Sequence, residues 1–310
     1  MSPSVIVACG GRSLERTISL QSGRRAAQAL QQLGYETTVL DVDESFIPEV
    51  QQADPAFVFL ALHGAGGEGG TAQDILGILD IPYTGSDAVS SALCLDKHLF
   101  KALCLLRGIP TPAWHAFTQQ AFTEYGAGVA LGPIAAQFPD GLVVKPASEG
   151  SSLGISIVRG EEHLRGAIVA ALSYGDRVLL EEYIPGRELA VTVVGPATDP
   201  RVLPVIEIVY DDPLYSFAAH YEIGSAQVRA ADLPPDLDAT VRDVAARAYA
   251  AAGCRDYARV DIRLDDRGPW VLEINTAPGL TETGPTPAAA DIADLSFTGL
   301  IETICRRVRG

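Results

Sequence analysis

The chain has 310 residues, 47 per cent of them hydrophobic and 20 per cent charged, which allows two or three domains with substantial buried cores. No apolar run approaches the length that crosses a bilayer, so we expect no membrane partner. The formal net charge of −16 argues against a general affinity for nucleic acid, because phosphate binding needs clustered Lys and Arg.

Neither the cysteines nor the first residues indicate an oxidising compartment. The five cysteines are odd in number and show no CxxC spacing, so we expect small core residues without a redox or metal role. The first segment enters a strand-like run without the basic head and cleavable apolar stretch of a signal peptide. We therefore expect a cytoplasmic location.

The first 95 residues alternate strands and helices in the manner of a parallel α/β unit. SVIVAC predicts a buried strand, residues 18–34 predict a helix that ends on Gly34, and residues 35–42 and 56–64 predict two further strands. We expect residues 1–95 to form one domain.

Residues 96–184 predict a smaller α+β domain. Its first helix begins near Asp96 and stops at Gly108, before prolines break the pattern. Strands are expected at 142–145, 155–158 and 177–184, with a helix over 161–172.

Residues 185–310 predict a third domain. The expected order is strands at 188–195 and 202–210, a looser polar stretch from Asp211 to Pro235, a helix over 236–253, strands at 257–264 and 269–275, and an amphipathic C-terminal helix.

The connection KPASEGSSLG, at 145–154, is longer than a tight hairpin needs and nearly lacks side chains that pack. Its glycines and serines leave backbone N–H groups free to approach an anion, and Lys145 adds a positive charge. A mobile surface hairpin is the alternative interpretation. The spacing is not that of a Walker loop, so a phosphate site here would belong to another class of nucleotide enzyme.

The last two predicted strands carry acidic and amide side chains at alternate positions. Asp261 shares a strand face with Arg259, and Glu273 shares one with Asn275. A hairpin would gather Asp261, Glu273 and Asn275 into a set of oxygen ligands that suits Mg²⁺ bound together with nucleotide phosphates. The alternative is a solvated strand face with Arg259 as the counter-ion.

A third group of carboxylates lies in EEYIPGRELAV. Glu181 and Glu182 fall where the chain leaves a strand, and Glu188 lies in the next strand. These side chains offer acceptors for an adenine amino group or for ribose hydroxyls, although exposed glutamates are the commoner explanation of such a pattern.

Together these stretches resemble an ATP-grasp carboxylate–amine ligase, and specifically the D-alanine:D-alanine ligase family. The similar segments follow one another through nearly the whole chain: GGRSLERTISLQSG at 10–23, LHGAGGEGGTAQ at 62–73, PYTGSDAVSSALCLDK at 82–97, VVKPASEGSSLG at 143–154, RVDIRL at 259–264 and LEINTAPGLT at 272–281. The resemblance implies an α/β and α+β ATP-grasp fold with an N-terminal parallel α/β domain, and a homodimer.

The resemblance also implies a nucleotide site between the second and third domains, closed by the glycine–serine loop as a lid. The implied ATP contacts are Lys97, Lys145, Ser151, Ser152, Glu181, Glu182, Ile184 and Glu188. Two Mg²⁺ ions would bind Asp261, Glu273 and Asn275, and bridge phosphate oxygens.

The implied chemistry joins two amino acids through an acyl phosphate, with D-alanyl-D-alanine for the cell wall as the leading product. The implied catalytic residues are Glu15, Ser151, Tyr221, Arg259 and Gly279, where Glu15 holds an ammonium group and the last two stabilise an oxyanion. The implied substrate contacts are Glu15, His63, His220, Tyr221, Arg259 and Gly284.

Four positions depart from the family pattern. His220 stands where a lysine is usual, Gly284 where a serine is expected, Gly69 where an acidic or amide residue is usual, and Arg263 where an apolar residue is usual. Arg263 is expected to face outward. The departures lie mostly at the substrate end, so the sequence predicts the reaction type more firmly than the product.

Three other functions remain as alternatives. A related ligase of a specialised pathway, such as antibiotic biosynthesis, would use a different second amine or close a ring within one substrate. A regulatory module that has lost catalysis is disfavoured, because the metal ligands and Arg259 are present. A dinucleotide-dependent oxidoreductase is disfavoured because no GxGxxG follows the first strand.

Overall fold

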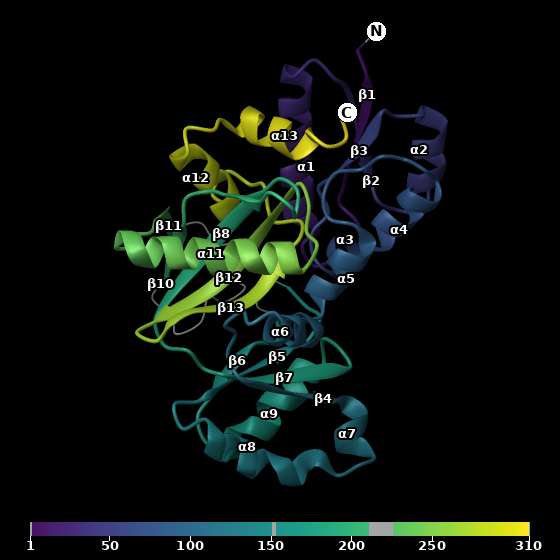
Figure 1. Cartoon of the computed structure of the whole chain (residues 1–310). Coiled ribbons are helices and arrows are strands. Elements are labelled where there is room, and N and C mark those ends of the chain that lie inside the picture. The colour runs from purple at the N-terminus through teal and green to yellow at the C-terminus, as the bar shows by residue number, and fades with distance from the viewer. Residues whose placement is uncertain (1, 151–152, 211–225, 310) are drawn as a thin grey trace.

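Three β-sheets organise the computed structural model, which describes residues 2–150, 153–210 and 226–309. Four predicted site residues, Ser151, Ser152, His220 and Tyr221, lie outside the described residues. In Figure 1 the largest sheet lies between the other two, and both ends of the chain lie beside the N-terminal sheet. Within the described ranges, no helix is long and apolar enough to cross a bilayer.

The N-terminal sheet is parallel, as predicted, with the strand order β2-β1-β3. Its elements are β1 (Ser4–Cys9), α1 (Arg16–Gln32), β2 (Glu36–Asp41), α2 (Phe46–Ala53), β3 (Phe57–Leu60), α3 (Ala65–Glu68), α4 (Thr71–Ile78) and α5 (Ala88–Leu95). Helix α1 packs on the sheet through buried side chains that include Ala26 and Leu30. A Cβ on Gly23 of this helix would lie 2.6 Å from the Cβ of Cys9, so glycine permits the close approach of α1 to β1.

The central sheet is antiparallel, with the strand order β4-β7-β5-β6. Its elements are β4 (Trp114–Thr118), α7 (Gln119–Thr123), the 3₁₀ helix η1 (Ala127–Ala130), α8 (Leu131–Gln137), β5 (Leu142–Pro146), β6 (Ser156–Val158), α9 (Glu161–Leu172) and β7 (Arg177–Glu182). It has a core of its own, in which Leu131 and Leu164 of the helices pack against Val144 and Leu180 of the strands.

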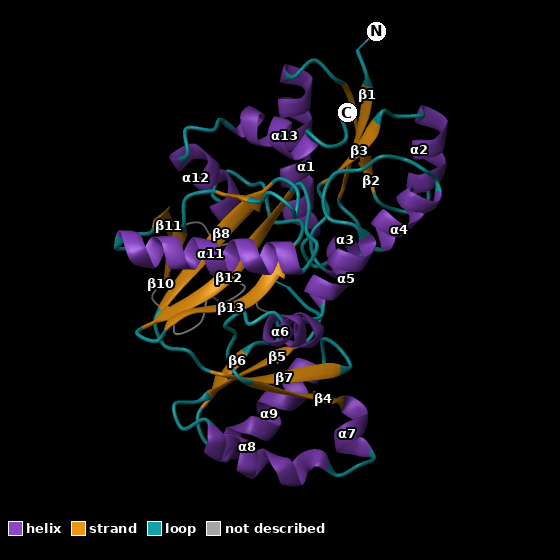
Figure 2. Ribbon diagram, viewed as in Figure 1, coloured by secondary structure: helices purple, strands orange, loops and turns teal. Residues whose placement is uncertain are grey.

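The largest sheet has the strand order β11-β10-β8-β12-β13, with β9 paired to β8. The remaining elements are α6 (Lys97–Leu106), β8 (Arg187–Val194), β9 (Arg201–Val202), β10 (Ile206–Tyr210), β11 (Ala226–Ala230), α11 (Pro235–Ala251), β12 (Tyr257–Asp265), β13 (Gly268–Asn275), α12 (Pro285–Ile292) and α13 (Phe297–Cys305). Successive residues of β8 serve opposite faces: Leu189 and Val191 pack with α6 and α11, whereas Ala190 and Val194 pack with α1, α12 and α13. The sheet therefore lies between two layers of helices (Figure 2).

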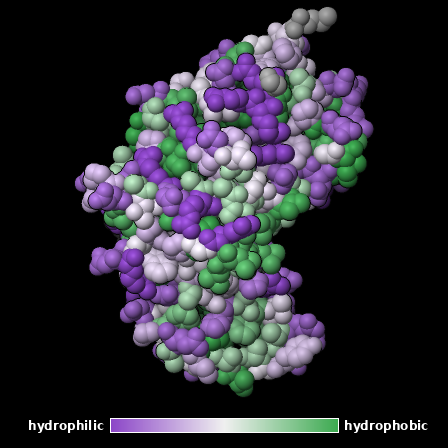
Figure 3. Space-filling view, viewed as in Figure 1, coloured by the Kyte–Doolittle hydropathy of each residue, from purple (hydrophilic) through white to green (hydrophobic). Residues whose placement is uncertain are grey.

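Helix α6 is oriented unlike an ordinary amphipathic helix. Asp96 caps its N-terminus, Lys97 and Lys101 are buried, and Leu105 and Leu106 are 65 and 83 per cent exposed. Figure 3 shows hydrophobic residues on the outer surface in the region of this helix. Because a buried lysine is costly unless it is paired, this orientation indicates anionic partners inside the molecule.

Helix α6 also bears on the predicted domain limits. Its Phe100 and Cys104 pack in the core of the largest sheet, although the sequence groups residues 97–106 with the central domain. The limits at 95/96 and 184/185 stay predictions.

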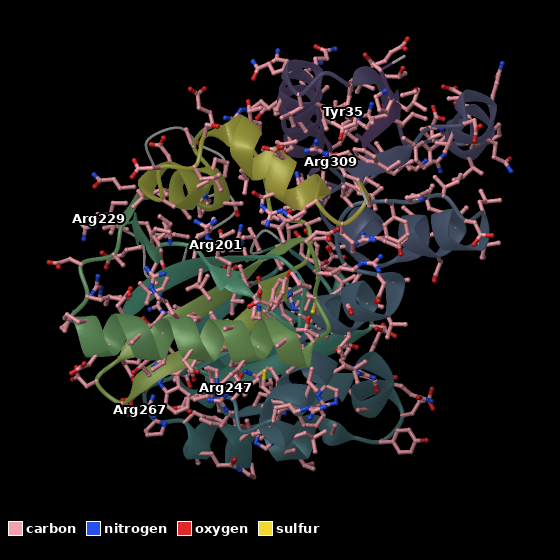
Figure 4. All side chains as sticks on the ribbon, turned by 45° about the horizontal axis from the view of Figure 1, so that its top comes forward. Tyr35, Arg201, Arg229, Arg247, Arg267 and Arg309 are labelled. Atoms are coloured by element: carbon pink, nitrogen blue, oxygen red, sulfur yellow. The ribbon has the colours of Figure 1, made fainter. Side chains whose placement is uncertain are left out.

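Two arginines tie separate parts of the chain together, and Figure 4 labels both. Arg247 of α11 donates to the carbonyl of Gly108, 2.8 Å away, just beyond α6. Arg267, in the turn between β12 and β13, pairs with Glu182 at the end of β7 at 2.9 Å. The second contact joins the largest sheet to the central sheet beside the functional site described below.

Most predicted elements are confirmed, but the short helices α2, α3, α4, α5, α7, η1 and α8 were not predicted, and four other elements differ. Strand β4 was missed, and β11 forms within the predicted polar stretch as an edge strand whose mostly exposed residues give no hydrophobic signal. The predicted strand over 202–210 is two strands, β9 and β10, interrupted around Pro204. The C-terminal helix is also divided, because Asp294 adopts a left-handed conformation with φ of 55° between α12 and α13.

Candidate active site

One cavity of about 550 Å³ is lined by all fourteen predicted site residues that lie in the described ranges. They are Glu15, His63, Lys97, Lys145, Glu181, Glu182, Ile184, Glu188, Arg259, Asp261, Glu273, Asn275, Gly279 and Gly284. Strands of the central and largest sheets contribute, together with the starts of α1 and α6, the end of α3 and the loops after β3 and β13. The position of each residue is thus established, and the role of each stays a prediction.

The floor of the cavity is the hairpin of β12 and β13. As predicted, the two strands pair so that Asp261 lies opposite Glu273 and Arg259 lies opposite Asn275. Arg259 donates two hydrogen bonds to Asp261, at 2.6 and 2.8 Å, and the Asn275 amide donates a third at 2.8 Å. Across the pair, the Lys97 ammonium lies 3.0 Å from Glu273. Two cations therefore balance two opposed carboxylates.

Burial and charge shift the two carboxylates in opposite directions. Burial raises the pKa of Asp261, and neighbouring Glu273 adds to the rise while Arg259 opposes it. Burial also acts to raise the pKa of Glu273, but Lys97 and Lys145 outweigh it and hold that pKa below its usual value. Glu273 is therefore the more firmly ionised member of the pair.

The oxygen atoms of this hairpin suit Mg²⁺. Two carboxylates and one amide supply hard oxygen donors, which Mg²⁺ prefers together with phosphate oxygens and water. The Asn275 nitrogen is already bonded to Asp261, so its oxygen is the atom left for a ligand. Within the described residues, no group of three or more His, Cys, Asp or Glu side chains is arranged to hold a metal ion.

A buried lysine pair flanks the carboxylates. Lys145 and Lys101 contact opposite oxygens of Glu181, at 2.7 and 2.6 Å, and all three side chains are buried. Burial would raise the pKa of Glu181, but the two lysines outweigh it and lower that pKa. Burial lowers the pKa of Lys101 to about 8, against the opposing charge of Glu181. Lys101 also donates to Thr111 at 2.6 Å, so the network has a fixed geometry.

The Lys97 ammonium also donates to the carbonyl of Glu149, 2.5 Å away, in the glycine–serine connection. The backbone N–H of Lys97 donates to the carbonyl of Ala147 at 2.8 Å. Two bonds thus join the start of α6 to the beginning of the predicted phosphate loop.

At the end of the cavity where Arg263 lies, one prediction is wrong. Arg263 does not face outward: its side chain is only 12 per cent exposed and lines the cavity. It pairs with Glu188 at 3.2 Å and donates to the Tyr210 hydroxyl at 2.9 Å and to the Ile184 carbonyl at 3.2 Å. Since residues 259, 261 and 263 alternate along β12, Arg263 shares the face of Arg259 and Asp261.

The opposite end of the cavity is acidic. Glu15 precedes α1, and Glu68 ends α3 as a second carboxylate that lines the same wall. Burial, followed by the charge of Glu15, raises the pKa of Glu68 well above its usual value. The cationic Arg259 opposes that rise. An ammonium group placed here would meet two carboxylates.

His63 joins this end to the loop after β13. Its Nδ1 lies 2.7 Å from the carbonyl of Ala277, which can only accept, so Nδ1 carries the proton. Its Nε2 lies 2.8 Å from the Ser22 hydroxyl, which also accepts from the backbone N–H of Leu280 at 3.0 Å. Burial lowers the pKa of His63 to about 4, so the ring is neutral at pH 7. His63 thereby holds the loop that carries Gly279.

Several charged residues of the cavity region were not predicted, and for three of them the sequence carries a signal. Lys101 lies four residues after Lys97 on the same helix, which places both on one face. Glu68 lies within the quoted segment LHGAGGEGGTAQ. Arg263 continues the two-residue period of Arg259 and Asp261, so the alternation that placed those two residues also places Arg263.

Known proteins are similar to this chain over nearly its whole length. The family model described as "D-ala D-ala ligase C-terminus" matches residues 103–306. The chain is 40% identical over 302 residues to the D-alanine–D-alanine ligase of Desulforudis audaxviator, which covers 97% of this chain and 96% of that protein. A relative from Moorella thermoacetica with the same name is 40% identical over 304 residues and covers 97% of both proteins.

Solved structures are similar to this chain over nearly its whole length as well. The D-alanine–D-alanine ligase of Bacillus anthracis, crystallised with ATP, is 31% identical with a TM-score of 0.83, and the match covers 99% of this chain and 98% of that one. The VanG D-Ala:D-Ser ligase of Enterococcus faecalis is 25% identical with a TM-score of 0.85, and the match covers 99% of this chain and all of that one. This similarity confirms the predicted α/β and α+β fold class.

The neutral, buried state of His63 predicts a pH dependence of stability. Because its pKa in the folded chain, about 4, lies below the ordinary value of 6.5, the unfolded chain binds the proton first as the pH falls. The stabilising contribution is complete above pH 6.5 and is lost as the pH falls toward 4. Between pH 7 and pH 5 we expect the wild type to lose about 2 kcal/mol more unfolding free energy than His63→Gln, measured by chemical denaturation.

His163, which is exposed on α9, provides the matched control. His163→Gln is expected to keep the wild-type pH dependence. Equal losses in His63→Gln and the wild type would show that His63 is not held neutral by burial.

Proposed function

This chain belongs to the D-alanine–D-alanine ligase family, and we propose that it joins two D-alanine molecules in an ATP-dependent reaction that supplies D-alanyl-D-alanine for peptidoglycan. Its fold is the ATP-grasp fold with an N-terminal parallel α/β domain. The observation that supports the proposal most directly is that one cavity combines paired lysines, opposed carboxylates and an acidic end.

ATP would occupy the part of the cavity between the central and largest sheets. Lys97 and Lys145 would hold its phosphates, since both ammonium groups lie at the cavity wall and a cationic donor forms a charge-assisted hydrogen bond with a phosphate oxygen. Glu181, Glu182, Glu188 and the backbone of Ile184 would contact the base and sugar. The Bacillus anthracis relative was crystallised with ATP, which supports ATP as the nucleotide.

Asp261, Glu273 and Asn275 would hold two Mg²⁺ ions, and bound Mg²⁺ neutralises phosphate charge during phosphoryl transfer. The charges of the hairpin suit this role. Each carboxylate already contacts a cationic side chain, and a metal ion could take the place of that contact. Lys97 would then shift its contact from Glu273 to a phosphate.

The reaction would proceed in two steps. The carboxylate of the first D-alanine attacks the γ-phosphorus of ATP, giving an acyl phosphate and ADP. The amine of the second D-alanine then attacks the acyl carbon and displaces inorganic phosphate, with loss of one proton. Glu15, in a network with Ser151 and Tyr221, would hold the first ammonium group. Arg259 and the N–H of Gly279 would stabilise the oxyanion of the tetrahedral intermediate.

Recognition of the second substrate is a separate part of the proposal. Gly284 caps α12 at the cavity wall, with its N–H bonded to the Thr281 carbonyl at 3.1 Å, and offers no side chain where the family has serine. A relative of similar fold is named a D-Ala:D-Ser ligase, so the second amine varies among similar proteins. A ligase with another second amine is therefore the alternative function.

The remaining predictions rest on the family resemblance. His220 and Tyr221 would contact substrate, and His220 would make that contact pH-dependent. The protein would act in the cytoplasm as a homodimer.

Phosphate release measured with ATP, Mg²⁺ and single or paired amino acids tests the proposed function. D-Alanine alone is expected to give turnover, with D-alanyl-D-alanine identified by mass, while L-alanine gives none. Turnover that requires a different second amine would establish the alternative, and phosphate release without any amide product would contradict both.

Arg259→Lys tests the oxyanion role. Lysine keeps the charge but loses the planar fork, so we expect kcat to fall by about 10²–10³-fold with a much smaller change in the KM of ATP. Arg255→Lys is the matched control, because Arg255 bonds to the carbonyl of Gly85 and does not line the cavity. A variant at Arg259 that kept more than a tenth of the wild-type kcat would contradict the assignment.

A further inference from the structure

Arg263 lies inside the cavity at a position where sequence analysis placed an outward side chain. In the register of the largest sheet it is directly opposite Glu188 of β8, and Glu188 is opposite Ile208 of β10, two residues before Tyr210. Three adjacent strands thus bring one cation, one carboxylate and one phenol to the same place. Apolar side chains of Ile184, Ile208 and Leu272 line the cavity around them.

The three polar groups form a closed triangle. The Nη1 atom of Arg263 donates to Oε2 of Glu188 at 3.2 Å and to the Tyr210 hydroxyl at 2.9 Å, and that hydroxyl donates to the same Oε2. The Nε atom of Arg263 is held by the Ile184 carbonyl at 3.2 Å. Among the described residues, the Tyr210 and Arg263 bonds to the Glu188 carboxylate both end on Oε2, so Oε1 is the oxygen left for a ligand.

This arrangement is more readily explained by ligand binding than by stability. A buried ion pair contributes little compared with apolar side chains of the same volume, and the walls around it are apolar. Burial raises the pKa of Glu188, and the bonds from Tyr210 and Arg263 oppose that rise, which favours a charged acceptor. A carboxylate fixed through one oxygen presents the other in a defined direction.

The spacing of side chains along β12 indicates which part of the ligand lies beside Arg263 and Glu188. Asp261, the proposed metal ligand, and Arg263 are two residues apart on one strand face, about 6.6 Å along the strand. A nucleotide whose phosphates meet the metal at Asp261 would place its sugar toward Arg263 and Glu188. The ligand chemistry at this end is therefore a pair of sugar hydroxyl groups, which are hydrogen-bond donors.

We propose that Arg263 is a positioning residue for nucleotide binding: together with Tyr210 it fixes the Glu188 carboxylate so that Oε1 accepts a hydrogen bond from a ribose hydroxyl. The proposal rests on the ATP site of the proposed function and adds to it a role for a side chain that differs from the family pattern. Arg263 itself acts through Glu188.

The test is equilibrium binding, without amino acid, of ATP, 2′-deoxy-ATP and 3′-deoxy-ATP to the full chain. In the wild type, loss of the hydroxyl that meets Glu188 is expected to weaken binding about tenfold, as for a hydrogen bond to a charged group. In Arg263→Leu, ATP itself should bind about tenfold more weakly, and loss of the same hydroxyl should then cost less than about twofold. Arg263→Lys should give an intermediate result.

Two further variants make the outcome decisive. Tyr210→Phe removes only the hydroxyl and should reduce the deoxy penalty even if Arg263→Leu does not fold, as judged by its thermal unfolding. Arg242→Leu is the matched control, because Arg242 forms an ion pair with Asp238 at 2.5 Å on α11 and does not line the cavity. It should bind all three nucleotides as the wild type does.

The same deoxy penalty in the wild type, Arg263→Leu and Tyr210→Phe would overturn the positioning role while leaving the ATP site intact. A wild type that binds no ATP would overturn the proposed function, and the role of Arg263 with it.

Discussion

The structure depends on the placement of two partly buried carboxylates opposite each other on neighbouring strands. Asp261 and Glu273 would repel each other at this spacing, so each needs a cation close by. Arg259 supplies one from the same strand, and Lys97 supplies the other from α6. The demand for the second cation explains why α6 turns Lys97 inward, and Glu181 of β7 holds Lys101 on the same buried face, so leucines of α6 are left on the surface. The charge balance of one hairpin therefore determines how a helix from the first third of the chain packs on the last.

The same hairpin arranges the proposed chemistry in order along one strand. Arg259, Asp261 and Arg263 follow one another at two-residue intervals, each about 6.6 Å from the next. In the proposed reaction these positions serve the oxyanion, the metal-bound phosphates and, through Glu188, the sugar. The acidic end formed by Glu15 and Glu68 lies beyond Arg259, where an amino acid would be activated. The contacts to the reacting carbonyl, to the phosphates and to the sugar would thus follow one another along the single strand β12.

Much of this organisation was predictable from the sequence because it depends on patterns that repeat within a few residues, such as the two-residue alternation of a strand. Strand alternation placed Asp261, Glu273 and Asn275 on one face, and capping and proline signals located α6. Burial of Arg263 was not predicted, since an arginine on a strand is usually exposed and its partner Glu188 comes from a segment 75 residues earlier. The edge strand β11 was missed for the opposite reason, because its exposed residues give no pattern. In both cases the outcome depends on pairing between segments far apart in the sequence. A local sequence pattern contains no information about such pairing.

The most direct test of the hairpin's role is the affinity for ATP measured with and without Mg²⁺, in the wild type and in Glu273→Gln. If Asp261 and Glu273 are carboxylates that exchange their cationic partners for metal, Mg²⁺ should tighten ATP binding in the wild type by about tenfold or more, and most of that gain should disappear in the variant. An affinity for ATP that is the same with and without Mg²⁺ in the wild type, or a gain that Glu273→Gln retains in full, would contradict the account.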